Sequence, residues 1–404
     1  MAITRNLSGH QQSVTAVIGL LILSIALRPP IISVGPILLL IQQHFQLSYT
    51  QAALLTSIPD VCMGVFALVV PSLARRFGID RSVVVALTLL GASTLLRALS
   101  PNAFFLLGST FFASIGIAVA GAMTGAWIKT HFAQRPALFM GIYAGGLSLG
   151  ATLAAVFSAP IAELAQDWRV SAGFWSVLCL TAIASWVWMA RRFATPAPAV
   201  KSPSSASKRL PWGNPQAWLI ALNFGAGQFV VYALFAWMAP ASVEASTSSV
   251  SPGVLLGIFT AVFAVASVGA GLIPGKAHDR RGLLGLSGLL ALLGVGGMAF
   301  LPAYWPMFYV VLAAIGLGMG FTVAMTLPLD HARTSEQAGL WTVFMLFIGY
   351  LIAALGPLLF GALREYAGHY GPAYTLLFAV LLLMLGITPL LRLAPATSPQ
   401  VSVA

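Results

Sequence analysis

The sequence predicts an all-α integral membrane protein with twelve transmembrane helices, and three observations support this prediction. Of its 404 residues, 59% are hydrophobic and only 7% are charged, whereas charged residues make up about 25% of a soluble domain. The hydrophobic residues are gathered in runs of about 20 or more, the length that crosses the ~30 Å hydrocarbon layer of a bilayer. One long polar stretch, residues 191–213, separates these runs into two sets of six. This composition excludes a soluble enzyme.

Each predicted span is an apolar run that ends at charged residues, proline or glycine. The twelve runs cover residues 14–41, 50–74, 82–100, 103–128, 137–162, 170–190, 216–240, 253–275, 284–301, 305–328, 338–362 and 372–393. The first run is too long for a signal-peptide core, so we expect it to remain as the first helix. The polar stretch is rich in Pro, Ser and Ala, which is typical of a flexible linker. We therefore expect an N-terminal bundle at 1–195, a linker at 196–213 and a C-terminal bundle at 214–404.

The positive charges predict the orientation of the chain. The net charge is +11, with 20 lysines and arginines. Two of these, Arg28 and Arg97, fall inside spans, and two more, Arg169 and Arg364, fall on one side of the predicted topology. The other sixteen fall on the opposite side, together with both tails. Because Lys and Arg are retained in cytoplasmic loops, we expect a bacterial inner-membrane protein with both termini in the cytoplasm. The basic character then reflects topology, and no nucleic-acid partner is expected.

An internal repeat relates the two predicted bundles. The octet PSLARRFG at 71–78 is followed 204 residues later by GKAHDRRG at 275–282. The second octet has the form G-x-x-x-D-R-x-G, and a loop of this kind in both halves resembles the major facilitator superfamily. The match is good at Gly275, Asp279, Arg280 and Gly282, while Pro71 and Arg75 replace the usual Gly and Asp in the first half. The resemblance implies a major facilitator fold with conformational-gating loops, which here comprise Arg75, Arg76, Gly78, Gly275, Asp279, Arg280 and Gly282.

Arg28 is the most informative residue of the first span. An arginine near the bilayer centre costs on the order of 2.5 to 3.5 kcal/mol, so it must face protein or water. Pro29 and Pro30 follow it, and because proline lacks an N–H and disfavours helix at the preceding residue, we expect a kink or opening at Arg28. The next half-helix would then begin beside the guanidinium, with the positive end of its dipole there. These features favour an anion, or a polar substrate with acceptor atoms. The alternative is an arginine held in a structural ion pair.

The segments LRPPIISVGPIL at 27–38 and AALLTSIP at 52–59 resemble one branch of this superfamily, that of the cyanate and 2-nitroimidazole transporters. Further matches are Arg97, AWMAP at 236–240 and LDH at 329–331, so the resemblance covers nearly the whole chain. It implies a secondary active transporter that moves a small polar or anionic, cyanate-like solute by alternating access. The alternative is efflux of a small toxic or drug-like compound such as a nitroimidazole.

Asp60 is the candidate for proton coupling. It lies about ten residues into the second span, and all six histidines lie in loops, tails or span ends. It is therefore the only embedded side chain that could carry a proton through a transport cycle. The alternative is a static pair in which Asp60 neutralises Arg28.

Four further residues are candidates for substrate binding. Tyr232 occupies the repeat-related position of Arg28, since 28 + 204 = 232, and Gln228 and Trp237 lie near it on the seventh span. Packing or a place in the interfacial aromatic belt is the alternative for these groups. Arg97 either extends to the outer headgroups or, as the resemblance implies, lines the central cavity.

Several functions are excluded by the residues that the spans lack. The segment GLIPGKA at 271–277 has the wrong spacing for a phosphate-binding loop and Ala in place of Ser or Thr, so we expect no ATP site. An embedded enzyme would need a pair of reactive groups at one depth, and the span interiors hold no histidine and a single acid. Cys62 and Cys179 lie far apart in apolar runs and indicate no metal site. We expect a monomer in the lipid bilayer without a cofactor, whose partner is a small solute.

Overall fold

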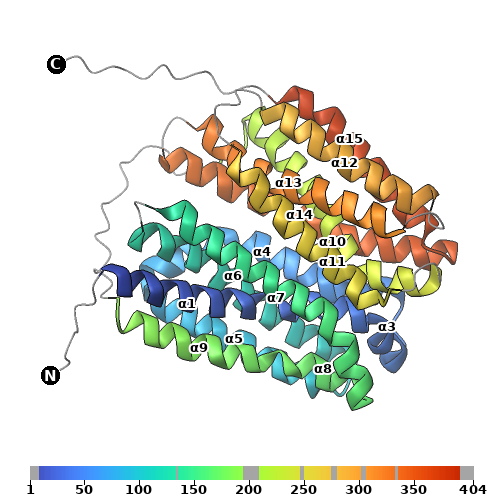
Figure 1. The fold of residues 1–404 in the computed structure, drawn as a ribbon, viewed down its shortest axis with the longest axis horizontal. Coiled ribbons are helices and arrows are strands. Elements are labelled where there is room, and N and C mark those ends of the chain that lie inside the picture. The colour runs from blue at the N-terminus through green and yellow to red at the C-terminus, as the bar shows by residue number, and fades with distance from the viewer. Residues whose placement is uncertain are drawn as a thin grey trace.

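Twelve helical segments of the chain are long and apolar enough to cross a membrane. A computed structural model describes residues 9–132, 135–193, 209–245, 250–273, 280–301, 306–332 and 335–391, and in this part of the chain helices are joined by short connections (Figure 1). Every predicted span corresponds to one of the twelve segments. The prediction of an all-α membrane protein is confirmed.

The first six spans lie between residues 9 and 190. The helices are α1 (Gly9–Leu27), α2 (Pro29–Ile32), α3 (Val34–Phe45), α4 (Tyr49–Phe77), α5 (Ile79–Ala98), α6 (Ala103–His131), α7 (Pro136–Ala165), α8 (Trp168–Phe174) and α9 (Ser176–Ala190). Local sequence sets several of these limits. Ser48 and Gln51 form a capping box at the start of α4, and the side chain of Asn102 caps α6. Gly78 has a φ of 77°, which permits the sharp turn between α4 and α5.

The last six spans follow the linker. The helices are α10 (Pro215–Ala245), α11 (Pro252–Leu272), α12 (Arg280–Phe300), α13 (Pro306–His331), α14 (Ser335–Ala367) and α15 (Gly371–Ile387), followed by a short 3-10 helix, η1 (Thr388–Leu390). Most of the linker predicted at 196–213 lies outside the described residues.

Helix contacts divide the described chain into two bundles. In the N-terminal half, α5 packs on α6 and α1 packs on α7; in the C-terminal half, α12 packs on α13 and α10 packs on α14. The two halves meet mainly where α4 lies against α14 and where α7 lies against α11. In Figure 1 the blue-to-green half and the yellow-to-red half lie side by side as two layers. This is the predicted arrangement of two six-helix bundles.

Hydrogen bonds join the two halves at particular places along the helices. We call the end that carries residue 9, the end of α9 and the start of α10 the linker side, and the opposite end the far side. On the far side, the backbone N–H and hydroxyl of Thr50 in α4 donate to Glu365 Oε2 in α14, at 3.2 and 2.9 Å. Near the middle of α7, the hydroxyls of Thr152 and of Thr260 in α11 are 3.0 Å apart. Hydrogen bonds between the halves therefore join the bundles on the far side and near mid-depth.

Two interruptions of helical geometry lie within the first span. The helix stops at Leu27 and again at Ile32, which confirms the predicted break at Arg28. The break is milder than predicted, because Arg28 keeps helical angles (φ −92°, ψ −35°) and its carbonyl still accepts from the N–H groups of Ile31 and Ile32. The segment after Arg28 is a single turn, and the longer helix α3 begins only at Val34. A helix does begin beside the guanidinium, as expected, with Arg28 at the N-cap of α2, but it is a single turn and not a continuous half-helix.

Candidate functional site

Arg28 lies at the break in the first span and reaches across to the other bundle. Its Nη1 donates to the hydroxyl of Tyr232 in α10 at 3.3 Å. The side chain is partly exposed, and no other hydrogen bond from it is found among the described residues. A guanidinium carries five N–H donors. Most of these donors therefore have no partner among the described residues.

One tyrosine hydroxyl contacts this guanidinium, and two further tyrosines act on its charge. The side chain of Tyr232 is 1% exposed, and its hydroxyl contacts Met63 Sδ in α4 at 3.9 Å. Its ring lies 6.2 Å from that of Tyr350 in α14, centroid to centroid. Tyr143 in α7 and Tyr350 both lie within electrostatic range of Arg28. Phenol groups from both halves thus provide hydrogen-bond donors and acceptors next to one positive charge.

Sequence reasoning found Tyr232 but missed Tyr143, Tyr350 and Met63. The repeat pointed to Tyr232 alone, because only that residue aligns with Arg28. A usable signal was the depth of the tyrosines: both Tyr143 and Tyr350 fall inside predicted spans, whereas interfacial tyrosines lie at span ends.

Asp60 in α4 is completely buried at 0% exposure. Neither of its carboxylate oxygens has a hydrogen-bond partner among the described residues, although the charge of Arg28 acts on it. In the part of the chain that the structure describes, the ion pairs within 4.0 Å are Arg280–Asp330 and Arg364–Glu244. The alternative of a direct Arg28–Asp60 ion pair is therefore wrong for this conformation. A carboxylate left without partners in the protein interior is costly unless it takes up a proton.

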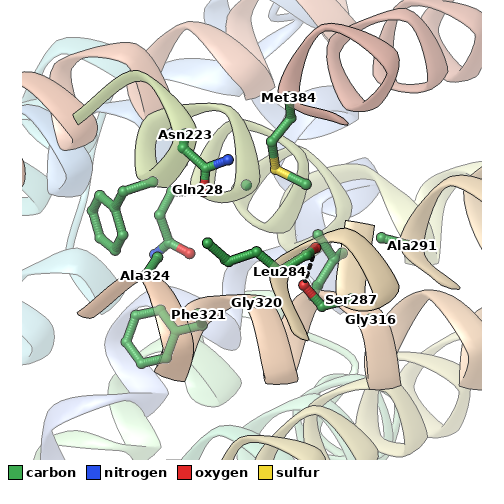
Figure 2. Close-up of a pocket in the computed structure, with 13 residues that line it drawn as sticks. Asn223, Gln228, Leu284, Ser287, Ala291, Gly316, Gly320, Phe321, Ala324 and Met384 are labelled. Carbon is green, nitrogen blue, oxygen red and sulfur yellow. Dashed lines mark hydrogen bonds between the residues drawn. The ribbon is translucent and has the colours of Figure 1, made fainter. Parts of the chain in front are cut away.

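Gln228 connects the tyrosines to a small cavity inside the C-terminal bundle. Its amide lies within reach of Tyr350, and it lines the cavity together with Asn223 and Ser287 (Figure 2). In Figure 2, Asn223 and Gln228 lie close together at one side of the cavity and Ser287 lies at the other. The remaining lining is formed by apolar side chains and glycines, and no charged side chain occurs among these described residues. The cavity suits an uncharged group.

Arg97 near the end of α5 is buried at 2% exposure. Its Nη1 donates to the backbone carbonyl of Pro30 at 2.7 Å. The alternative that Arg97 extends to the lipid headgroups is therefore wrong. The structure places its guanidinium against the backbone of the first span, directly behind the break that carries Arg28.

Trp237 lies apart from Arg28, in an aromatic cluster on the far side. It is fully buried, and its indole N–H donates to the carbonyl of Pro357 at 2.9 Å. Its ring lies 5.7 Å from Tyr49 and 6.1 Å from Tyr370. The expectation that Trp237 contributes to the same site as Arg28 receives no support from these contacts, which lie on the far side.

The predicted gating loops are described in part. In the first, Arg75 donates to Ser72 at 3.1 Å and Arg76 lies over the ring of Phe77. In the second, Gly275 and Asp279 lie outside the described residues. Arg280 at the start of α12 pairs with Asp330 at the end of α13, with 3.0 Å between Nη1 and Oδ2. A Cβ on Gly282 would meet no atom within 4 Å, so close packing does not explain that glycine.

Two six-helix bundles around a shared, charged centre are the architecture of a secondary transporter. The family model for the Major Facilitator Superfamily matches residues 17–357, and the chain belongs to this superfamily.

Relatives of known name agree with this membership. The chain is 32% identical to the cyanate transport protein of Escherichia coli (strain K12) over 384 residues, which cover 94% of this chain and 97% of that protein. It is 26% identical to the 2-nitroimidazole transporter of the same organism, with 92% and 93% covered. It is also 26% identical to an uncharacterized transporter of Bacillus subtilis (strain 168), with 92% of each covered. The predicted branch of the superfamily is confirmed.

Among solved structures, the chain resembles a bacterial homologue of the human lysosomal transporter Spinster in an inward-facing, unoccupied conformation. The TM-score is 0.70 at 18% identity, and 95% of each chain is covered. At this identity the likeness concerns the fold alone.

Proposed function

We propose that this membrane protein is a secondary active transporter that moves a small polar or anionic, cyanate-like solute by alternating access. It would lie in the inner membrane of a bacterium with both termini in the cytoplasm, and would act as a monomer. The halves at 1–195 and 214–404, joined by the linker, would move as two bodies around a central site formed by Arg28, Tyr232 and Gln228.

The observation that carries this proposal is that most N–H donors of Arg28 have no partner among the described residues. One of its N–H groups is hydrogen bonded to Tyr232, and the side chain is partly exposed at the break in the helix. A planar guanidinium with free donors binds carboxylate-like or other acceptor-bearing groups in two places at once. A small anion would satisfy these donors, and the phenols around them would complete its coordination.

The balance of buried charge also supports an anion. Arg28 and Arg97 each carry a positive charge in the span interiors, and Asp60 is the single acid there. With Asp60 ionised the three groups sum to +1, and with Asp60 protonated they sum to +2. Electrostatics therefore favour a negatively charged solute in either state, more strongly once Asp60 has taken up a proton.

Asp60 would couple transport to protons. Because its oxygens have no partner among the described residues, protonation would relieve an unfavourable buried charge. Binding of an anion beside Arg28 would add negative charge near Asp60 and favour that protonation further. One proton would then accompany one monovalent anion.

The conformational cycle would exchange the contacts on the two sides of the membrane. The far side is joined by Thr50 and Glu365, so the present state would open toward the linker side. The two gating loops lie at the linker-side ends of α4 and α11. They would form contacts when that side closes.

A second candidate is efflux of a small uncharged compound such as a nitroheterocycle. The neutral amides of Gln228 and Asn223 favour it, because no charged side chain lines the described cavity beside them (Figure 2). The cavity has room for about one water molecule in this conformation, so it would have to widen to admit the compound. In this case Gln228 and Asn223 would bind the compound, and Arg28 would contribute less.

Both candidates are tested by ligand-induced thermal stabilisation of purified protein, with cyanate, thiocyanate, nitrate and 2-nitroimidazole as probes. The anion proposal expects stabilisation by at least one anion, loss of this effect in Arg28→Ala, and saturable counterflow in proteoliposomes. Arg192→Ala, which removes an arginine stacked on Trp188 at the surface, serves as the control. Stabilisation by an anion that persists in Arg28→Ala would refute the role of Arg28. A response to 2-nitroimidazole alone would favour the second candidate.

A further inference from the structure

A second arginine in the span interior is attached to the same helix break as Arg28, from another helix. Arg97 in α5 donates from Nη1 to the carbonyl of Pro30 at 2.7 Å, and its Nε has no partner among the described residues. No acid of the described chain lies within ion-pair distance of it. The described polar contact of this buried charge is therefore a hydrogen bond to a backbone carbonyl.

The carbonyl that Arg97 binds belongs to the turn that carries Arg28. The one-turn helix α2 begins at Pro29 and ends at Ile32. Carbonyls near a helix end need partners from outside the helix. The Ser33 hydroxyl does not supply one, because it is buried without a partner among the described residues. The guanidinium of Arg97 supplies a charge-assisted hydrogen bond at this point, a stronger kind than a neutral one.

The energetic argument points to function. A buried arginine without an acid is expensive, and an apolar residue in the same place would avoid the expense. In transporters, interrupted helices stand where substrate sites are built, and their exposed backbone must be satisfied by the protein. The charged side chain of Arg97 thus lies where the Pro30 carbonyl, next to the site of Arg28, requires a hydrogen-bond donor.

We propose that Arg97 is a positioning residue: by holding the Pro30 carbonyl, it fixes the turn from Arg28 to Ser33 and keeps the Arg28 guanidinium directed at the solute. Arg97 itself does not touch the solute. The inference rests on the proposed role of Arg28 in binding an anion, and its structural part can be tested without any solute.

The structural part is tested by the reactivity of a thiol at the turn. Ser33→Cys is introduced with Cys62→Ala and Cys179→Ala, which remove the two native, buried thiols. The Ser33 side chain is buried, so the new thiol should react slowly with a small maleimide. Adding Arg97→Gln, which keeps an amide N–H donor group but removes the charge, or Arg97→Met, which removes both donor and charge, should raise the rate. We expect about a tenfold increase for Met and a smaller one for Gln, with Arg192→Gln as the control.

The functional part uses potassium cyanate as the probe and measures affinity in the same proteins. If Arg97 acts by position, cyanate affinity should fall as the maleimide rate rises. Affinity should be weakest in Arg97→Met and intermediate in Arg97→Gln. Arg97→Lys, which keeps both charge and donor, should lie nearest to wild type. Equal losses in Gln and Met at unchanged maleimide rates would show that Arg97 acts through its charge or as a ligand, and would overturn the proposal. Unchanged rates and affinities would overturn it as well.

Failure of the proposed function gives a different result. If wild-type protein binds no cyanate but Arg97→Met still raises the reactivity at position 33, the positioning role stands and the anion assignment falls. Each variant is compared only as a monodisperse sample; if Gln and Met do not fold, Arg97→Lys alone provides the comparison. In that case, a maleimide rate equal to wild type in Arg97→Lys, together with a weakened affinity for cyanate, would overturn the proposal.

Discussion

Arg28 and Tyr232 are 204 residues apart and their side chains are joined by a hydrogen bond of 3.3 Å. The same interval separates the related loops at 71–78 and 275–282. Residues that correspond in the two halves of the repeat thus touch at the centre of the molecule. A residue pair of this kind lies near the pseudo-twofold axis, so the proposed relative motion of the halves would act directly on the Arg28 side chain.

Replacing Tyr232 with Phe should weaken binding of an anion while preserving the fold. The change removes the hydroxyl that accepts from Arg28 and leaves the ring against Tyr350. A hydrogen bond to a charged group contributes about 1.5 to 3 kcal/mol, so affinity should fall roughly 10- to 100-fold. Isothermal titration of Tyr232→Phe and of the control Tyr309→Phe measures this. Affinities equal to wild type would show that the Tyr232 hydroxyl does not support Arg28.

Asp60→Asn should separate proton coupling from solute movement. The amide cannot take up a proton, so accumulation driven by a pH gradient should fall to the level of empty liposomes, whereas solute exchange at equal pH should persist. Transport assays in proteoliposomes measure both. Glu163→Gln, an exposed acid of α7, is the matched control. Accumulation that still follows the pH gradient in Asp60→Asn would assign coupling to another group.

Glu365→Ala should favour opening of the far side. It removes the acceptor of both hydrogen bonds from Thr50. Because these bonds are exposed, the population of the open state should rise only about two- to tenfold. Spin labels on cysteines at Gln166 and Tyr366, both exposed on the far side, report the distance between the halves by electron resonance.

Glu163→Ala removes another exposed far-side acid and should leave the distance distribution of these labels unchanged. A distribution in Glu365→Ala that matches wild type would mean that the contact with Thr50 does not hold the far side closed.

Gly35→Ala should destabilise the closed far side by steric overlap. A Cβ at Gly35 in α3 would overlap the carbonyl oxygen of Phe235 in α10, so the two helices would have to separate. Overpacking of this kind costs about 1 to 3 kcal/mol, and the melting temperature in detergent should fall. In Gly125→Ala the added Cβ meets no atom within 4 Å, so that control should melt like wild type. Equal melting of both variants would contradict the close approach of α3 and α10.

The fold could be predicted from sequence because the bilayer imposes its own length scale on apolar runs. Each of the twelve spans was recognisable, and the break at Arg28 followed from Pro29 and Pro30. The strength of the break was overestimated, since Arg28 retains helical angles while two prolines follow it. The residue preference before proline is a tendency that tertiary packing overrides.

The central site could be predicted only where the sequence repeats itself. Tyr232 was found because it aligns with Arg28, whereas Tyr143 and Tyr350 reach the site through the rotation of α7 and α14, which no local pattern specifies. The contact of Arg97 with the Pro30 carbonyl was likewise hidden, because backbone acceptors have no signature in sequence. Trp237 shares a helix with Tyr232, but five residues further along it lies in the aromatic cluster on the far side.

The position of Arg364 bears on the height of the barrier between conformations. Its guanidinium lies over the rings of Tyr49 and Tyr370, at 4.7 and 5.1 Å, and its Nη2 is 2.7 Å from Glu244 Oε2. Glu244 and Arg364 both belong to the C-terminal bundle, so this ion pair can travel with that bundle when the halves part. Separation of the halves would move Tyr49 away from the Arg364 guanidinium and would break the hydrogen bonds between Thr50 and Glu365. The charges of Arg364 and Glu244 would still neutralise each other. Such a closure could release quickly, as the proposed alternating-access cycle requires.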